Sequence, residues 1–179
     1  GGTAGHINPA IPVARTVKEK NPAANIVFVG NKDSLEEKLV KKAGFDIRFI
    51  KVTGFKRSLS LHNFKTVLWF ARAVKECKRI IKECNIDIVI GTGGYVSGPA
   101  VYAAHALGVK TCIHEQNAFP GMTSKFLSKY VDTVFISFES SKKYFKKALG
   151  ALETINLVKQ FTFFNAKTGH YYNAYCALP

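Results

Sequence analysis

Five short apolar runs, separated by segments with helical periodicity, constrain the fold of this chain more than any other feature. The runs cover residues 25–30, 45–50, 86–90, 110–114 and 133–137, and they are rich in Val and Ile without polar alternation. Strands of this composition are typical of parallel sheets that helices cover on both faces. The sequence therefore predicts an α/β fold with a doubly wound, Rossmann-like parallel sheet, whose ligands collect at the carboxyl ends of the strands.

Helix-end signals lie between these runs. Asn8 followed by Pro9 predicts the start of the first helix, Ser34 and Glu37 form a capping box, and Gly44 is suited to close that helix. Further helices are expected over residues 61–84, 100–107, 123–130 and 140–148. No apolar run approaches the roughly 18 residues that would cross a membrane, so we expect one globular domain in a chain of 179 residues.

Two glycine-rich turns stand where predicted strands would end. The first is Gly1-Gly2-Thr3-Ala4-Gly5-His6, ahead of the first helix, and the second covers residues 91–98. Glycine lets backbone N–H groups approach an anion, and the dipole of a following helix favours negative charge. Neither turn has the G-x-G-x-x-G spacing of a dinucleotide site or the G-K-[ST] ending of a P-loop. The turns therefore indicate an anion site that is neither a dinucleotide site nor a P-loop. The alternative is that these glycines only make tight turns.

Four consecutive polar side chains, His114-Glu115-Gln116-Asn117, stand at the end of the fourth run. Groups that titrate or hydrogen-bond at the carboxyl end of a strand indicate a functional site. The structural alternative is that His114 is an ordinary buried histidine and that Asn117 only forms a turn. The sequence has no convincing metal-ligand spacing, so we predict neither a metal nor another cofactor.

These motifs, with Gly93-Gly94-Tyr95-Val96-Ser97-Gly98-Pro99 in the second turn, resemble the N-terminal domain of the MurG family of peptidoglycan N-acetylglucosaminyltransferases. The resemblance covers about residues 1–148. It implies one acceptor-binding domain of the two-domain GT-B architecture, without its first strand and without the donor domain. The implied reaction is inverting transfer from UDP-N-acetylglucosamine to the 4-hydroxyl of undecaprenyl-linked muramoyl-pentapeptide, the step from lipid I to lipid II. This chain alone is expected to be inactive.

The resemblance also implies roles for individual residues. His6 is implied as a candidate for the catalytic base or for a sugar contact, with Glu115 as a second, weaker candidate for the base, and imidazole suits proton removal near neutral pH. The implied donor contacts are Thr3, Ala4, Gly5 and Asn117. The implied contacts to the acceptor diphosphate are Gly2, Gly5, Gly93, Gly94, Tyr95 and Ser97, which agrees with the anion site deduced from the glycine turns.

The expected helix over residues 61–84 carries a second functional signal. Formal net charge is +14, and residues 51–83 hold nine Lys or Arg against two Glu. The expected core face of this helix consists of Phe64, Val67, Phe70, Val74, Cys77, Ile81 and Cys84. Beside it runs a stripe, here called the membrane stripe, that consists of Leu61, Lys65, Leu68, Trp69 and Arg72.

Apolar side chains beside basic ones are typical of the interface with an anionic membrane, and a lipid-linked substrate requires such a site. We therefore predict an anionic membrane surface as a partner and a peripheral location on the cytoplasmic side of the cell membrane. A solvated basic face is the alternative.

Residues 149–179 do not resemble the family. They contain six aromatic residues without a recognisable period. We predict a domain boundary at residue 148 and an unassigned tail, for which a shifted reading frame or a truncated gene is one explanation. Two other functions stay open, another GT-B enzyme with a lipid acceptor and a non-enzymatic basic module that binds anions. No nucleic acid is expected as a partner, because the sequence has no aromatic platform among its basic residues.

Overall fold

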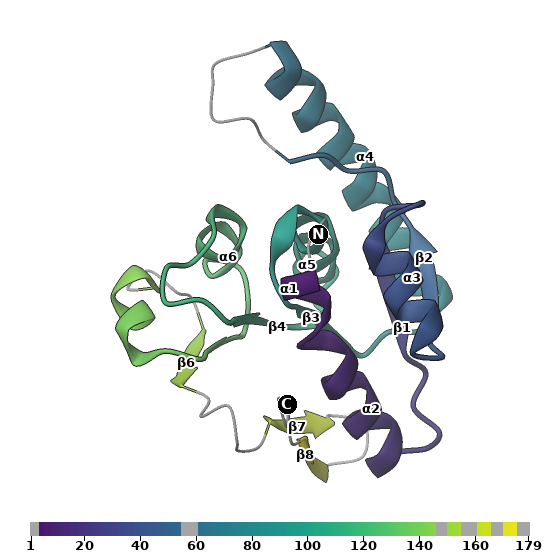
Figure 1. Cartoon of the computed structure of the whole chain (residues 1–179), viewed down its shortest axis with the longest axis vertical. Helices are drawn as coiled ribbons and strands as arrows, with labels where there is room; N and C mark the ends of the chain where they lie inside the picture. Colours follow the sequence, from purple (N-terminus) through teal and green to yellow (C-terminus); the bar gives the residue numbers. More distant parts are fainter. Residues whose placement is uncertain (1–3, 55–60, 146–149, 155–160, 166–169, 175–179) are drawn as a thin grey trace.

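The computed structural model of the chain describes residues 4–54, 61–145, 150–154, 161–165 and 170–174 (Figure 1). All five apolar runs form strands, as the sequence predicts, and further strands follow them. The strands are β1 (Val27–Gly30), β2 (Asp46–Phe49), β3 (Ile88–Gly91), β4 (Lys110–Glu115), β5 (Thr133–Ile136), β6 (Ala151–Thr154), β7 (Phe161–Asn165) and β8 (His170–Ala174).

The strands form two parallel sheets and one hairpin. β1 pairs with β2 in one sheet, and the other sheet has the order β3-β4-β5-β6 with every pair parallel. β7 and β8 form a separate antiparallel pair. The predicted parallel α/β architecture is confirmed. β6 extends the larger sheet beyond residue 148, into the segment that the sequence leaves unassigned.

Helices alternate with β1 to β6 along the chain. They are α1 (Ala4–Ile7), α2 (Ala10–Lys20), α3 (Leu35–Lys42), α4 (Leu61–Glu83), α5 (Gly94–His105), α6 (Met122–Leu127) and the 3-10 helix η1 (Glu139–Phe145).

The larger sheet is covered on both faces. Val13 of α2 packs with Cys112 and Phe135, while Val101 of α5 packs with Ile113. Because Cys112 and Ile113 are consecutive residues of one strand, their side chains point to opposite faces of the sheet. The doubly wound arrangement is therefore present, as predicted.

The predicted helix ends are only partly correct. Ser34 Oγ accepts the N–H of Glu37 at 3.3 Å, and Gly44 follows α3 with φ of +82°, as expected of a capping residue and a closing glycine. Asn8 does not cap α2, because the capping position belongs to Pro9, which makes no side-chain bond. α5 begins at Gly94 and not near residue 100, so the second glycine turn itself forms the first turns of a helix.

The core face of α4 differs from the predicted one. Cys77 and Ile81 are buried as expected, but Val67 is 54% exposed, and Thr66 and Ala73 are buried in its place. Ala73 packs in one hydrophobic cluster with Val96 and Ala103 of α5, and a stripe chosen by hydrophobicity alone passes over Thr and Ala. Phe64 lies in the part of α4 whose side chains are not described.

Candidate functional site

Two segments far from His6 in the sequence converge on it. The Nδ1 atom of His6 lies 3.2 Å from the carbonyl oxygen of Thr92, after β3, and 2.9 Å from Nε2 of Gln116, after β4. Thr92 Oγ1 donates to the His6 carbonyl at 2.6 Å, and Gln116 Nε2 donates to the Gly5 carbonyl at 3.1 Å. The structure thus gathers residues of all three sequence motifs at the carboxyl ends of β3 and β4. Gly2 and Thr3 lie outside the described residues.

The contacts of the His6 imidazole define what it can do with a proton. A carbonyl oxygen only accepts, so the contact with Thr92 requires the proton on Nδ1, which leaves the lone pair on Nε2. In the other neutral tautomer, Nδ1 accepts from the Gln116 amide. Burial lowers the pKa of His6 below its ordinary value, so the ring is neutral at neutral pH. A neutral imidazole at this position has the form that a base requires.

The second glycine turn packs directly against this imidazole. Gly93 has φ of +99° and Gly94 has φ of +72°, a backbone region that favours glycine. A Cβ at Gly93 would lie 2.7 Å from His6 Nδ1, so a side chain and the imidazole cannot share this space. Tyr95 and Ser97 lie in the first turns of α5, where Ser97 Oγ donates to the Gly94 carbonyl at 2.8 Å.

Gly93→Ala is expected to displace the His6 imidazole toward solvent and to raise its pKa toward the ordinary value of 6.5. An NMR titration of the imidazole measures this change. Gly108→Ala is the matched control, because Gly108 also has a positive φ, +70°, but nothing lies within 4 Å of its added methyl group. The control should lose about 1 kcal/mol of stability to backbone strain and leave the titration of His6 unchanged. An unchanged titration in Gly93→Ala would show that this contact does not hold the ring.

Glu115 shapes the loop that follows β4. Its side chain is 2% exposed. Oε1 accepts the backbone N–H of Asn117 at 3.0 Å and its side-chain amide at 2.8 Å, while Oε2 accepts the N–H of Gly121 at 3.2 Å. Because both carboxylate oxygens are engaged by this loop, the geometry favours a positioning role for Glu115 over a role as a base.

His114 lies beneath the site and is 5% exposed. Its Nε2 is 2.9 Å from Ser137 Oγ, and this contact joins the end of β4 to the residue that follows β5. Burial lowers the pKa of His114 from 6.5 to about 4, so the ring is neutral across the physiological range. This environment is that of a structural histidine, the alternative that the sequence left open.

Acid is expected to destabilise the chain through His114. The unfolded chain takes up this proton near pH 6.5 and the folded chain only near pH 4, so stability falls as pH falls between these values. The loss from His114 is about 3 kcal/mol between pH 7 and pH 4, and urea unfolding at both pH values measures it. His114→Gln should show a correspondingly smaller loss, while exposed His105→Gln should behave like the parent. Equal pH dependence in the parent and His114→Gln would refute this explanation.

The membrane stripe is partly visible on α4. Leu68 is 50% exposed and Arg72 is exposed. The Trp69 ring is partly covered by cations, with Lys51 Nζ 4.2 Å and the Arg72 guanidinium carbon 5.3 Å from its centre. The side chains of Leu61 and Lys65 are not described. Val67, which the sequence assigns to the core, adds a second exposed apolar side chain next to Leu68.

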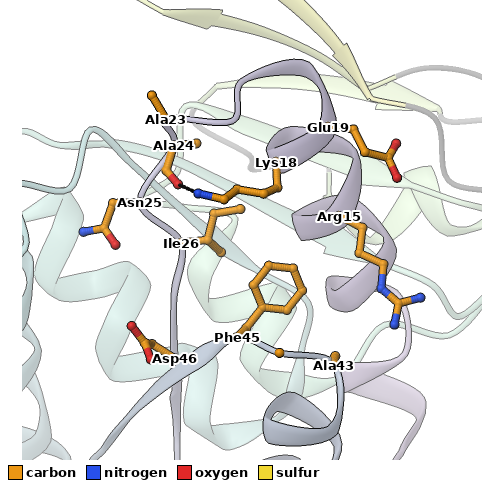
Figure 2. A pocket seen from close by; sticks show the side chains of 11 residues that line it. Arg15, Lys18, Glu19, Ala23, Ala24, Asn25, Ile26, Ala43, Phe45 and Asp46 are labelled. Atoms are coloured by element: carbon orange, nitrogen blue, oxygen red, sulfur yellow. Dashed lines mark hydrogen bonds between the residues drawn. The ribbon is translucent and has the colours of Figure 1, made fainter.

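A cavity of about 680 Å³ lies elsewhere on the molecule, between α2 and the residues that lead into β1 and β2 (Figure 2). Arg15, Lys18 and Phe45 are among the residues that line it, and Lys18 Nζ donates to the Ala24 carbonyl at 2.9 Å. The cavity is at the amino ends of the strands, so it contains none of the predicted site residues. We assign the candidate site to the carboxyl ends, where the hydrogen-bonded side chains gather.

Within the described ranges, no group of three or more His, Cys, Asp or Glu is arranged to hold a metal ion. Among the same residues, no helix has the length and apolar character needed to span a membrane.

Known proteins match this chain in sequence and in fold. Residues 1–136 match the glycosyltransferase family 28 N-terminal domain. A relative from Alkaliphilus oremlandii is 49% identical over 146 residues, and one from Bacillus thuringiensis is 50% identical over 148 residues. Both are named UDP-N-acetylglucosamine--N-acetylmuramyl-(pentapeptide) pyrophosphoryl-undecaprenol N-acetylglucosamine transferase, the second with the number 2. The crystal structure of MurG from Acinetobacter baumannii is similar with a TM-score of 0.68 and 31% identity.

These matches cover most of this chain but less than half of each relative. The two sequence matches cover 82% and 83% of this chain, against 40% and 41% of the relatives. The structural match covers 86% of this chain and 42% of the Acinetobacter protein. The chain therefore spans about two fifths of the length of the curated relatives that it matches.

Proposed function

Because the chain belongs to glycosyltransferase family 28, whose N-terminal domain matches residues 1–136, we propose that it forms the acceptor-binding half of an inverting N-acetylglucosaminyltransferase. The proposed donor is UDP-N-acetylglucosamine, and the proposed acceptor is undecaprenyl-linked muramoyl-pentapeptide. The names of the Alkaliphilus and Bacillus relatives support these substrates. Through peptidoglycan synthesis, the reaction would serve cell shape and cell division.

The convergence of His6, Thr92 and Gln116 is the observation that carries this proposal. The acceptor 4-hydroxyl attacks the anomeric carbon of the donor sugar, and its proton passes to Nε2 of His6. The bond from that carbon to the diphosphate oxygen breaks, and the electron pair leaves with UDP. In the tautomer with the proton on Nδ1, the Thr92 carbonyl accepts a hydrogen bond from Nδ1, so Nε2 is left as the base and the imidazolium that forms is stabilised.

The proposed diphosphate site is the start of α5. Backbone N–H groups in the first turn of a helix lack intrahelical partners, and Gly93 and Gly94 add no side chains of their own beside them. Gly5 and Asn117 border the same end of the sheet and are the proposed donor-sugar contacts, with Ala4 of α1 beside them. Asn117 is exposed while its amide is oriented by Glu115, so its carbonyl oxygen is available to a sugar hydroxyl.

A chimaera tests this function. In it, the 146 matched residues of the Alkaliphilus oremlandii relative are exchanged for those of this chain, so the rest of the relative supplies the remaining parts of the enzyme. The expected result is transfer of N-acetylglucosamine to a short-chain lipid acceptor at a rate within about tenfold of the rate of the relative. A chimaera that folds and binds the donor but transfers no sugar would refute the proposed role of this domain.

The exposed part of the membrane stripe supports a peripheral location at the cytoplasmic face of the membrane. Leu68 and Val67 present apolar surface, and Arg72 and Lys75 are exposed basic residues on the same helix. Near an anionic surface, each basic residue adds about 1 kcal/mol of attraction. We propose that this surface holds the domain where a lipid-linked acceptor resides.

Replacing Val67 and Leu68 together with serine is expected to weaken binding to phosphatidylglycerol vesicles about tenfold, since two half-exposed aliphatic side chains would no longer enter the lipid. Co-sedimentation measures the binding. Leu35→Ser is the matched control, because Leu35 is 45% exposed on α3, outside the stripe. The control should bind as the parent does. Equal effects of both changes on binding would contradict the assignment of this surface.

A further inference from the structure

The His6 imidazole makes two contacts through one nitrogen, and these contacts require opposite proton positions. Nδ1 lies 3.2 Å from the Thr92 carbonyl oxygen and 2.9 Å from Nε2 of Gln116. A carbonyl oxygen only accepts, so the first contact is a hydrogen bond only when Nδ1 carries the proton. An amide N–H only donates, so the second is a hydrogen bond only when Nδ1 has its lone pair. The two partners therefore compete for the tautomer of the neutral ring.

The orientation of the Gln116 amide is determined by a third group. Nε2 of Gln116 also donates to the Gly5 carbonyl oxygen at 3.1 Å. Rotating the amide by half a turn would place Oε1 against this oxygen, and two acceptors so close repel each other. Among the described residues, Oε1 has no hydrogen-bond partner that would favour another orientation. The amide is thus held with one N–H toward Gly5 and the other toward His6.

The segments that carry the imidazole and the amide are both anchored. Thr92 Oγ1 donates to the His6 carbonyl at 2.6 Å, which ties α1 to the end of β3 (Figure 1). Gln116 stands between Glu115, which is 2% exposed, and Asn117, whose backbone N–H donates to the Glu115 carboxylate at 3.0 Å. The imidazole and the amide therefore meet in a geometry that neither segment can leave without breaking other hydrogen bonds.

We propose that Gln116 is a positioning residue that sets the tautomer of His6 and holds the resting ring with its proton on Nε2. With the proton on Nδ1 instead, two N–H groups would face each other at 2.9 Å, and Gln116 could not turn away without losing Gly5. With the proton on Nε2, the unfavourable contact is that of the Nδ1 lone pair with the Thr92 oxygen, at the longer distance of 3.2 Å. The geometry thus favours the form bonded to Gln116.

The catalytic consequence rests on the proposed function of His6 as the base. A ring with its proton on Nε2 offers the acceptor hydroxyl no lone pair there, so the base form is the one bonded to Thr92. A hydroxyl that donates to Nε2 favours this same form. The exchange moves one proton from Nε2 to water and another from water to Nδ1, so the charge of the ring is unchanged. Gln116 thereby keeps His6 out of its base form until a hydroxyl is present.

Nitrogen NMR of the isotope-labelled 179-residue chain at neutral pH reads the tautomer directly. An imidazole nitrogen without a proton resonates far downfield of one that carries it, and we expect Nδ1 to be the downfield nitrogen of His6. His105, which is exposed, shows the spectrum of a ring that Gln116 does not hold. A proton on Nδ1 of His6 in the parent chain would overturn the proposal.

Gln116→Leu removes the donor to Nδ1. The ratio of the two tautomers is expected to change at least about fivefold toward the proton on Nδ1, the equilibrium equivalent of one hydrogen bond. Thr92→Val is the matched control, because it removes the hydrogen bond from Thr92 Oγ1 to the His6 carbonyl but leaves both contacts of Nδ1. The control should keep the proton on Nε2. An unchanged ratio in Gln116→Leu, or an equal change in both variants, would show that Gln116 only anchors α1.

A measurement on the parent chain decides the question if Gln116→Leu does not fold. A scalar coupling between Gln116 Nε2 and His6 Nδ1 exists only across a hydrogen bond, so its presence supports the proposal and its absence overturns it. The proposed function fails separately. If the tautomer behaves as expected but His6→Ala stays active in the chimaera, His6 is not the base while Gln116 still sets its tautomer. If His6→Ala is inactive but Gln116→Leu leaves the tautomer unchanged, only the inference about Gln116 fails.

Discussion

Replacing His6 with alanine in the Alkaliphilus chimaera is expected to lower kcat by about 10²- to 10⁴-fold, the usual contribution of a general base. The physical reason is that the acceptor hydroxyl would lose the lone pair that removes its proton. The KM for the lipid acceptor should change little, because the proposed diphosphate contacts come from the start of α5. Steady-state transfer of labelled N-acetylglucosamine measures both constants.

The pH profile gives this prediction a second readout. A base acts when deprotonated, so kcat/KM should fall with decreasing pH below an acid limb set by His6. Burial lowers the pKa of His6, so this limb should lie below 6.5 and be absent in His6→Ala. His105→Ala is the matched control, since His105 is exposed and packs on Tyr102 and Tyr130 away from the site. Activity of His6→Ala within a few-fold of the parent would eliminate His6 as the base.

Glu115→Ala is expected to lower the free energy of unfolding of the 179-residue chain by about 2–4 kcal/mol. The change removes the acceptor of three hydrogen bonds from Asn117 and Gly121, in a position that is 2% exposed. Urea unfolding measures the difference. Glu139→Ala is the matched control, because Glu139 forms an exposed ion pair with Lys142 and should contribute less than about 1 kcal/mol.

Glu115→Gln separates the positioning role from a catalytic one. Glutamine keeps one carbonyl oxygen for Asn117 and loses mainly the bond to Gly121, so we expect a cost of about 1 kcal/mol. In the chimaera, this variant should keep activity within about tenfold of the parent. A glutamine amide cannot act as a base in place of a carboxylate. A loss of kcat as large as that predicted for His6→Ala would therefore transfer the catalytic role to Glu115.

The local parts of the fold could be predicted from sequence because they depend on short-range chemistry. Apolar runs of β-branched residues specified the first five strands, and Ser34 with Glu37 specified the start of α3. The start of α5 was mispredicted because Gly94 and Gly98 are poor helix formers, so glycine content favoured a loop. Val67 was mispredicted because apolar character does not say which face of α4 meets α5.

The three motifs predict where the candidate site lies, but not its internal organisation. The sequence by itself determined the order of strands and helices and the three polar or glycine-rich motifs, because each depends on residues within a few positions of one another. Only the tertiary structure decided that Thr92 and Gln116 both meet His6, since contacts between residues 86 and 110 positions apart depend on how the strands are placed in the sheet. The same long-range packing buried Glu115 and left β1 and β3 unpaired toward each other, because pairing and burial belong to the assembled layers and not to any single segment.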